Sequence, residues 1–154
     1  AGGVVLSFGD ADIVVDETLL NESSTIEAAG NLSLQAQQIR NARETFEVQA
    51  RVTTNQYSNV AIGVSGKYKS GKRSYTETIT THSVTADSAA GQILSGGDMT
   101  LLGNVDNIYS TISAAGDLHV EGAILNNQDY VVVDSNVHAG TDTLKYEKKV
   151  CDLK

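Results

Sequence analysis

The sequence predicts an all-β protein built as a parallel β-helix with an antiparallel β-hairpin excursion. Three stretches of the chain resemble one another, and apolar residues inside them are spaced by two; the 154 residues include no proline. A period near 20 residues is typical of one coil of a solenoid, and apolar spacing of two is typical of a strand. Proline is absent from the interior of such sheets because every strand residue there must donate a backbone hydrogen bond.

The repeats define the predicted coils. They read IEAAGNLSLQAQQIRN at 26–41, ILSGGDMTLLGNVDN at 93–107 and ISAAGDLHVEGAILN at 112–126. Each has an aliphatic start, a Gly followed by Asp or Asn, two apolar residues spaced by two, and an aliphatic-x-Asn end. We expect each strand to pair with its counterpart in the next coil at ~4.8 Å. Gly and Asn suit the corners, where the backbone is tight or left-handed, and stacked Asn side chains are expected to form ladders.

Residues 43–87 contain no recognisable coil. Phe46, Val48, Ala50 and Val52 alternate with polar residues, residues 60–64 alternate again, and a Thr-rich run follows at 74–85. A Lys-Ser-Gly-Lys turn at 69–72 separates the last two runs. This pattern predicts a β excursion at 43–87 that leaves a single β-helix segment spanning residues 1–154.

The coil pattern weakens after residue 128. Val131–Val133 is interpreted as a further coil strand and Thr143–Val150 as a final one. At about 19 residues a coil, the residues outside the excursion predict about six coils. Solenoids need caps, and neither end shows one, so a segment of a longer rod is expected.

The composition argues against several classes of protein. With 11 basic and 19 acidic residues the formal net charge is −8, which argues against a nucleic-acid-binding domain. The longest apolar runs have three residues, whereas a membrane span needs about 18. The single cysteine, Cys151, excludes an internal disulfide framework. It is interpreted as a free thiol, with an intermolecular disulfide as the alternative.

The coils SGGDMTLLGNVDN and SAAGDLHVEGAILNNQ resemble the haemagglutinin repeats of filamentous haemagglutinin and its relatives. These relatives are exoproteins of two-partner secretion systems and include CdiA-type contact-dependent growth inhibition proteins. The block that contains the excursion is similar to the family's interrupted variant, so the resemblance covers roughly residues 19–128. It implies a right-handed parallel β-helix, export through an outer-membrane transporter, and a place in the secreted fraction or on the bacterial cell surface. It supplies no catalytic residues.

Two groups of residues resemble parts of known sites without completing one. Residues 66–72 read GKYKSGK, which matches part of a phosphate-binding loop, but Arg73 stands where that motif needs Ser or Thr, and no helical pattern follows. A charged β turn is predicted instead. His82, His119 and His138 have no partner at the spacing of metal ligands, so solvated or locally bonded histidines are expected.

The carboxylates have a structural explanation too. Asp98 and Asp117 share one repeat position with Asn31. Calcium binding is one interpretation, but turn hydrogen bonding explains why Asn is accepted there. The cluster of Asp10, Asp12, Asp16 and Glu17 is read as a solvated face. No nucleophile elbow or Ser-His-Asp arrangement is present, so no catalytic residue, metal site or cofactor is assigned.

The excursion has the opposite charge from the rest of the chain. Residues 50–76 hold five basic residues and no acidic one, whereas the remainder holds six basic and 19 acidic residues. Tyr and Arg are enriched at binding hot spots, and positive patches attract anionic partners. The candidate binding surface comprises Arg51, Tyr57, Lys67, Tyr68, Lys69, Lys72, Arg73 and Tyr75. A target-cell receptor or an anionic glycan would suit it; the alternative is a hairpin that only protects the solenoid flank.

The function expected from these features is that of a non-catalytic structural or adhesive shaft in a secreted exoprotein. Two alternatives stay open at this point. The first is a receptor- or glycan-binding module that acts through the basic excursion. The second is a β-helical polysaccharide lyase or hydrolase, because fold alone does not determine function.

Overall fold

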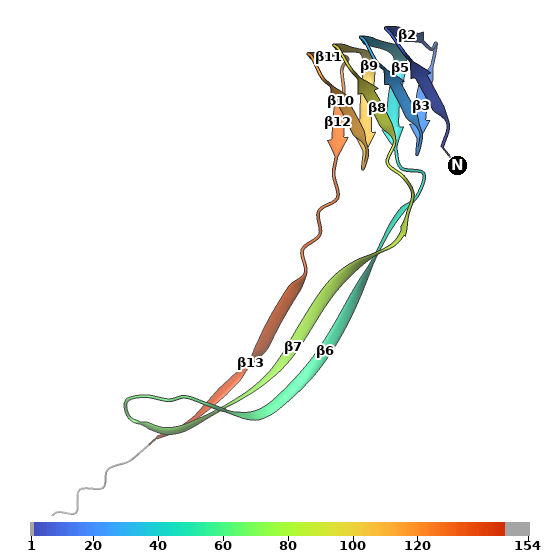
Figure 1. Ribbon diagram of the computed structural model, residues 1–154. Coiled ribbons are helices and arrows are strands. Elements are labelled where there is room, and N and C mark those ends of the chain that lie inside the picture. The colour runs from blue at the N-terminus through green and yellow to red at the C-terminus, as the bar shows by residue number, and fades with distance from the viewer. Residues whose placement is uncertain (1, 147–154) are drawn as a thin grey trace, which may run out of the picture. The chain divides into compact units, whose positions relative to one another are not determined.

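The computed structural model describes residues 2–146, which form 13 strands (Figure 1). Ten strands make four coils, and each coil advances the chain by about 20 residues apart from the long insertion between the second and third. The first coil holds β1 (Val4–Ser7), β2 (Ala11–Val14) and β3 (Thr18–Glu22), and the second β4 (Thr25–Ala28) and β5 (Leu32–Ala42). The third holds β8 (Gln92–Ser95) and β9 (Met99–Ile108), and the fourth β10 (Thr111–Ala114), β11 (Leu118–Glu121) and β12 (Leu125–Gln128).

The coils pair in parallel along two sheets. One sheet has the order β1-β4-β8-β10; the other has the order β11-β9-β5-β2, with β3 on β5 and β12 on β9. The register keeps equivalent repeat positions aligned, so that Val5, Ile26, Ile93 and Ile112 form one column. The predicted all-β parallel β-helix is therefore confirmed. The four coils of residues 2–146 are fewer than the six predicted, because residues after 128 leave the stack.

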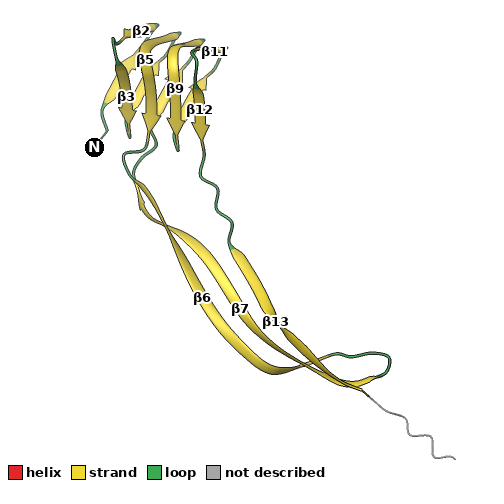
Figure 2. Ribbon diagram, turned by 180° about the vertical axis from the view of Figure 1, so that it is seen from behind, coloured by secondary structure: helices red, strands yellow, loops and turns green. Residues whose placement is uncertain are grey.

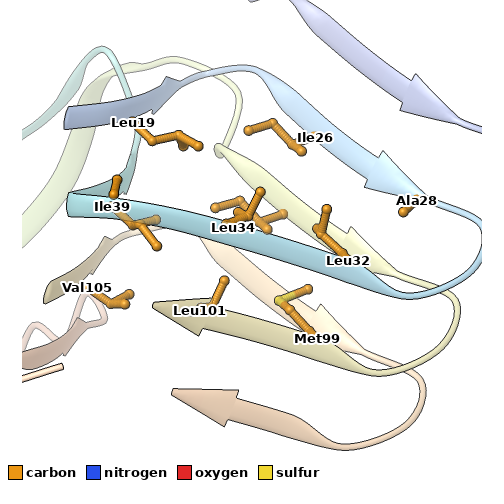
Figure 3. Packing of buried hydrophobic residues seen from close by; sticks show 11 residues of the cluster. Leu19, Ile26, Ala28, Leu32, Leu34, Ile39, Met99, Leu101 and Val105 are labelled. Atoms are coloured by element: carbon orange, nitrogen blue, oxygen red, sulfur yellow. The ribbon is translucent and has the colours of Figure 1, made fainter. Parts of the chain in front are cut away.

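The core is the column of aliphatic side chains between the sheets (Figure 3). Leu32, Leu34, Ile39, Met99 and Leu101 are at most 1% exposed. Leu32 and Leu34 of β5, and Met99 and Leu101 of β9, occupy alternate positions, which places each pair on one face of its strand. Ile39 faces the same core because the register shifts between Gln35 and Gln38. Each such buried side chain contributes about 1.5–3 kcal/mol relative to the exposed state. The period-two pattern thus builds the stack.

A ladder of asparagines runs through one corner of all four coils. Nδ2 of Asn21 donates to Oδ1 of Asn41 at 2.7 Å, Asn41 to Asn107 at 2.8 Å, and Asn107 to Asn127 at 2.7 Å. Asn21 and Asn41 are buried, at 2% and 0% exposure. Buried amides are tolerated only when their hydrogen bonds are made. The predicted ladder of stacked asparagines is confirmed, except that the fourth coil contributes Asn127 and not Asn126, which ends the predicted 112–126 repeat.

The opposite corner carries a second column. Oδ1 of Asp10 accepts from the backbone N–H of Asn31, Oδ1 of Asn31 from that of Asp98, and Oδ1 of Asp98 from that of Asp117, at 2.7–2.9 Å. The corner side chains are thus hydrogen-bonded as predicted, but the bonds join successive coils and do not close local turns. A Cβ at Gly97 would lie 2.3 Å from Oδ1 of Asn31. The glycine is therefore needed for close approach, and its backbone is not left-handed.

The insertion after the second coil is a long hairpin, β6 (Phe46–Ile62) and β7 (Tyr68–Asp87). The hydroxyl of Thr85 donates to the carbonyl of Glu47, and Nδ2 of Asn55 donates to the carboxylate of Glu77. The partner number on β7 falls as the number on β6 rises, so the two strands run antiparallel. β13 (Ser135–Tyr146) pairs antiparallel with β7, giving a three-stranded sheet in the order β13-β7-β6 (Figure 2).

The end of the chain differs from the prediction. Residues 131–133 form no strand, and the last described strand is β13, which pairs with the hairpin and not with a coil. Residues 147–150 of the predicted Thr143–Val150 strand lie outside the described residues, as does Cys151. The reason is that β13 finds its hydrogen-bond partner more than 50 residues earlier in the chain, at Tyr68–Thr80, which local patterns do not reveal.

The described chain divides into two compact units. The coil unit comprises residues 2–48 and 84–131, and the sheet unit residues 49–83 and 132–146. The coil unit holds two basic and 14 acidic residues, a net charge of −12, while the sheet unit holds six basic and three acidic ones, a net charge of +3. Charge is therefore segregated between the two units.

Arg43 secures the point where the hairpin leaves the coil unit. Its Nε donates to the carbonyl of Tyr109 at 2.7 Å, and its Nη1 donates to the carbonyl of Ser88 at 2.7 Å and to Asp87. The guanidinium also lies 5.5 Å from the ring centroid of Phe46. A single side chain thus joins both ends of the insertion to the third coil.

Candidate binding surface

The centre of the three-stranded sheet carries a row of stacked rings. Tyr57 of β6 stacks on Tyr75 of β7 with centroids 4.7 Å apart and planes at 18°, and Tyr75 lies 4.9 Å from the ring of His138 on β13. One ring comes from each strand. His138 is the register partner of Glu77 and lies diagonally from Tyr75, whose own partner is Gly140. Such aromatic pairs contribute about 0.5–1.5 kcal/mol beyond their buried area.

Glu77 lies at the centre of a polar network on the same face. Its carboxylate accepts from Nδ2 of Asn55 and the hydroxyl of Tyr57 on β6, and from Nδ2 of Asn136 on β13, at 3.0–3.1 Å. Nε2 of His138 lies 3.1 Å from Oε1. These hydrogen bonds, that from Asn55 first, lower the pKa of Glu77 to about 2. The carboxylate is ionised and joins all three strands.

Arg73 forms an ion pair next to this network. Its Nε and Nη2 donate to the two oxygens of Asp142 at 2.7 and 2.9 Å, which is the bidentate arrangement. The hydrogen bonds with Arg73 hold the pKa of Asp142 below its ordinary value. A shallow hollow beside the pair is also lined by Tyr75 and His138. The charge of Arg73 is thus matched within the sheet.

The lysines of the predicted surface are distributed differently. Nζ of Lys67 lies 5.0 Å from the ring centroid of Tyr146, whose ring meets that of Tyr68 edge-on at 5.5 Å. Lys69 is exposed close to these residues in sequence. Lys72 is exposed and, by strand alternation, faces away from the stacked rings. Within residues 2–146 no carboxylate forms an ion pair with any of the three lysines.

The eight predicted residues therefore do not form one patch. Tyr57, Arg73 and Tyr75 lie together on one face, and Lys67 and Tyr68 gather at Tyr146. Lys72 lies on the other face, and Arg51 is exposed on β6, six residues before the first stacked tyrosine. Their role in binding stays a prediction.

Sequence reasoning missed the residues that organise this face. They are Glu77, Asn136, His138 and Asp142, and three of them come from β13. The available signal was the period-two spacing of Asn136, His138 and Asp142, but nothing local indicated pairing with β7. A carboxylate inside a basic hairpin was also easy to overlook because Glu77 lies one residue outside the basic segment.

Three arrangements in the structure concern phosphate and metal binding. The predicted charged turn at 69–72 is wrong, because the hairpin turns at 63–67 and β7 begins at Tyr68 within the GKYKSGK segment. No helix N-terminus is therefore available there for phosphate. The histidines sit in pairs with single carboxylates: His82 with Asp134 at 3.2 Å and His138 with Glu77 at 3.1 Å. Within residues 2–146, no group of three or more His, Cys, Asp or Glu residues is placed to hold a metal ion.

The family is decided by comparison with known proteins. The family model of the haemagglutinin repeat matches residues 9–143, which include all strands of the coils except β1, the hairpin and most of β13. The chain belongs to the haemagglutinin repeat family. No curated protein and no solved structure matches it. As a filamentous-haemagglutinin-type repeat segment, it is of the kind that forms structural or adhesive parts of secreted or cell-surface exoproteins. No helix of the described residues is long and apolar enough to cross a membrane.

Proposed function

We propose that this haemagglutinin repeat segment is a non-catalytic shaft of a large exported bacterial exoprotein, an adhesin or a contact-dependent growth inhibition effector. In this proposal the coils wind right-handed, the parent protein leaves through a two-partner outer-membrane transporter, and the shaft holds a distal domain away from the cell. The supporting observation is the coil stack, in which each coil makes the same contacts with the next. Such a stack extends by repetition.

A second candidate function is recognition of an anionic glycan or receptor by the sheet unit. It is favoured by the segregated positive charge, +3 against −12 on the coil unit. Lys67, Lys69 and Lys72 would supply the attraction, because Arg73 is already matched by Asp142. Exposed charges act over about a Debye length, so this binding would weaken as salt rises.

One experiment separates the two functions. The labelled chain is titrated onto bacterial and epithelial cells and onto heparin, beside the triple variant K67Q/K69Q/K72Q and the matched control Arg40→Gln on the coil unit. A passive shaft shows no saturable binding. Saturable, salt-sensitive binding that the triple variant loses and the control retains would establish the second function and contradict a purely passive role. Assays for unsaturated products from pectin, alginate and chondroitin test the lyase alternative.

A further inference from the structure

β6 is an edge strand whose outer side has no partner strand within residues 2–146. The sheet has the order β13-β7-β6, and along the chain β6 lies directly between β5 and β7. Exposed edges are usually protected from pairing by Lys, Pro or a short strand. β6 runs from Phe46 to Ile62 without Lys or Pro, and its charged residues are Glu47 and Arg51. This edge is therefore open to pairing with another strand.

The middle of β6 alternates regularly between the two faces of the sheet. The hydrogen bonds of Glu47 and of Asn55 with β7 keep one pairing offset, so no bulge lies between these two residues. The first left-handed residue of the strand is Asn59, at φ 56°. Arg51 and Tyr57 consequently lie on the same face.

Arg51 and Tyr57 each present a group that the described chain leaves free. Arg51 is exposed and, within residues 2–146, forms no ion pair. One face of the Tyr57 ring stacks on Tyr75 of β7 with centroids 4.7 Å apart. Because β6 is the edge strand, the other ring face is turned toward the open side of the sheet. A guanidinium is attracted to the face of such a ring.

We propose that the open edge of β6 pairs with β6 of a second copy of this chain, antiparallel and about a two-fold axis. The axis passes through Thr54, so that Arg51 of each copy lies directly opposite Tyr57 of the other. Opposite side chains on one face have Cβ atoms about 4.5–5.5 Å apart, which is within the range of a cation–π contact. Residues 50–58 pair without bringing like charges together, since Arg51 is the charged residue among them.

The distribution of charge selects this register. An axis through Arg51 would bring two guanidinium groups together. An axis through Gln49 would pair Arg51 with Glu47 of the other copy, but the strands would then overlap only over residues 46–52. Because each chain has one β6, the assembly closes at two copies. The pairing goes beyond the proposed shaft function, since it joins two shafts through their sheet units.

The first test is sedimentation equilibrium of the whole chain carrying Cys151→Ser, which removes the native thiol. The mass is expected to rise with concentration from monomer to dimer and to stop there. Arg51→Glu should raise the dissociation constant about tenfold or more, because both cation–π contacts are lost. Lys72→Glu, an equal change of charge at an exposed position of β7, is the matched control and should dimerise like the parent chain. Circular dichroism checks that each variant keeps its β content.

Cross-linking tests the register in the same background. Thr54→Cys places the two thiols together on the axis, so mild oxidation should give a disulfide-linked dimer. Gln56→Cys, exposed in the same strand, would face Val52 of the other copy and should stay unlinked. A monomeric chain at every concentration, oligomers larger than a dimer, or equal dimerisation by Arg51→Glu and Lys72→Glu would overturn the proposal. Cross-linking of Gln56→Cys as fast as that of Thr54→Cys would overturn it too.

Discussion

Replacing Asn41 by Leu should strongly destabilise the coil unit, although the two side chains are similar in size. Asn41 is 0% exposed and makes four hydrogen bonds. Its Oδ1 accepts from Asn21, and its Nδ2 donates to Asn107 and to the carbonyls of Gly91 and Thr111. Because Nδ2 shares two protons among its three acceptors, the contacts amount to about three full hydrogen bonds. At about 1 kcal/mol for each, and with about 1 kcal/mol more for the unsatisfied buried acceptor left on Asn107, the loss is about 4 kcal/mol. Burial of the leucine returns about 1–2 kcal/mol, so the expected net loss is about 2–3 kcal/mol.

The matched control is Asn127→Leu at the end of the same ladder. Asn127 is exposed and is held by one ladder bond, from Asn107, so its replacement should cost about 1 kcal/mol or less. The free energy of unfolding is measured by urea denaturation followed by far-ultraviolet circular dichroism. Hydrogen exchange read by mass spectrometry assigns the change to the coil unit. If Asn41→Leu costs no more than Asn127→Leu, the ladder does not stabilise the stack and the reasoning is refuted.

Three further predictions concern other contacts. Gly97→Ala should lower the free energy of unfolding by about 1–3 kcal/mol and lower the melting temperature, because the added Cβ would lie 2.3 Å from the corner side chain of the preceding coil. The control Gly63→Ala has open space around the added Cβ and should leave the melting temperature unchanged. The lowered pKa of Glu77, about 2 against 4.5, means that its stabilisation of the sheet unit is present above pH 4.5 and is lost as the pH falls toward 2. Urea midpoints read from tyrosine fluorescence should therefore fall over that window in the unaltered chain and fall less in Glu77→Gln; equal slopes would contradict this. Arg43→Gln should raise hydrogen exchange at both ends of the insertion, since the carbonyl of Tyr109 loses its charged donor, and unchanged exchange would mean that the hairpin root is held by other contacts.

Much of the coil unit was predictable because its signals are local and repeated. The corner pair Gly97-Asp98 recurs as Gly116-Asp117, and the asparagines at 21, 41, 107 and 127 follow aliphatic residues at fixed positions. Side chains at the same repeat position lie directly above one another in successive coils and have the same neighbours. A residue type that recurs at that position therefore predicts a column of that residue along the stack. The hairpin was predictable too, from alternation on both sides of a Gly-containing turn.

The sheet unit shows what a single sequence leaves open. The eight basic and aromatic residues were selected by type, but β13 decides their surroundings: it brings Asp142 to Arg73 and His138 to Tyr75 and Glu77. Arg73 was predicted to contribute positive charge to a binding surface, and in the structure its guanidinium forms an ion pair with Asp142 of the same sheet. The charges and rings were readable from the sequence, whereas their neighbours were not.

By itself, then, the sequence determined the all-β class, the stacked coils with their asparagine and corner columns, and the place of the insertion. Each of these depends on residues close in the chain or related by a fixed repeat. Only the tertiary structure decided the number of coils, the pairing of β13 with β7, and the network around Glu77. β13 and β7 have different residue patterns and are not related by the repeat. Their pairing is made by backbone hydrogen bonds, which any residues can form, so the sequence does not show that these two strands are partners.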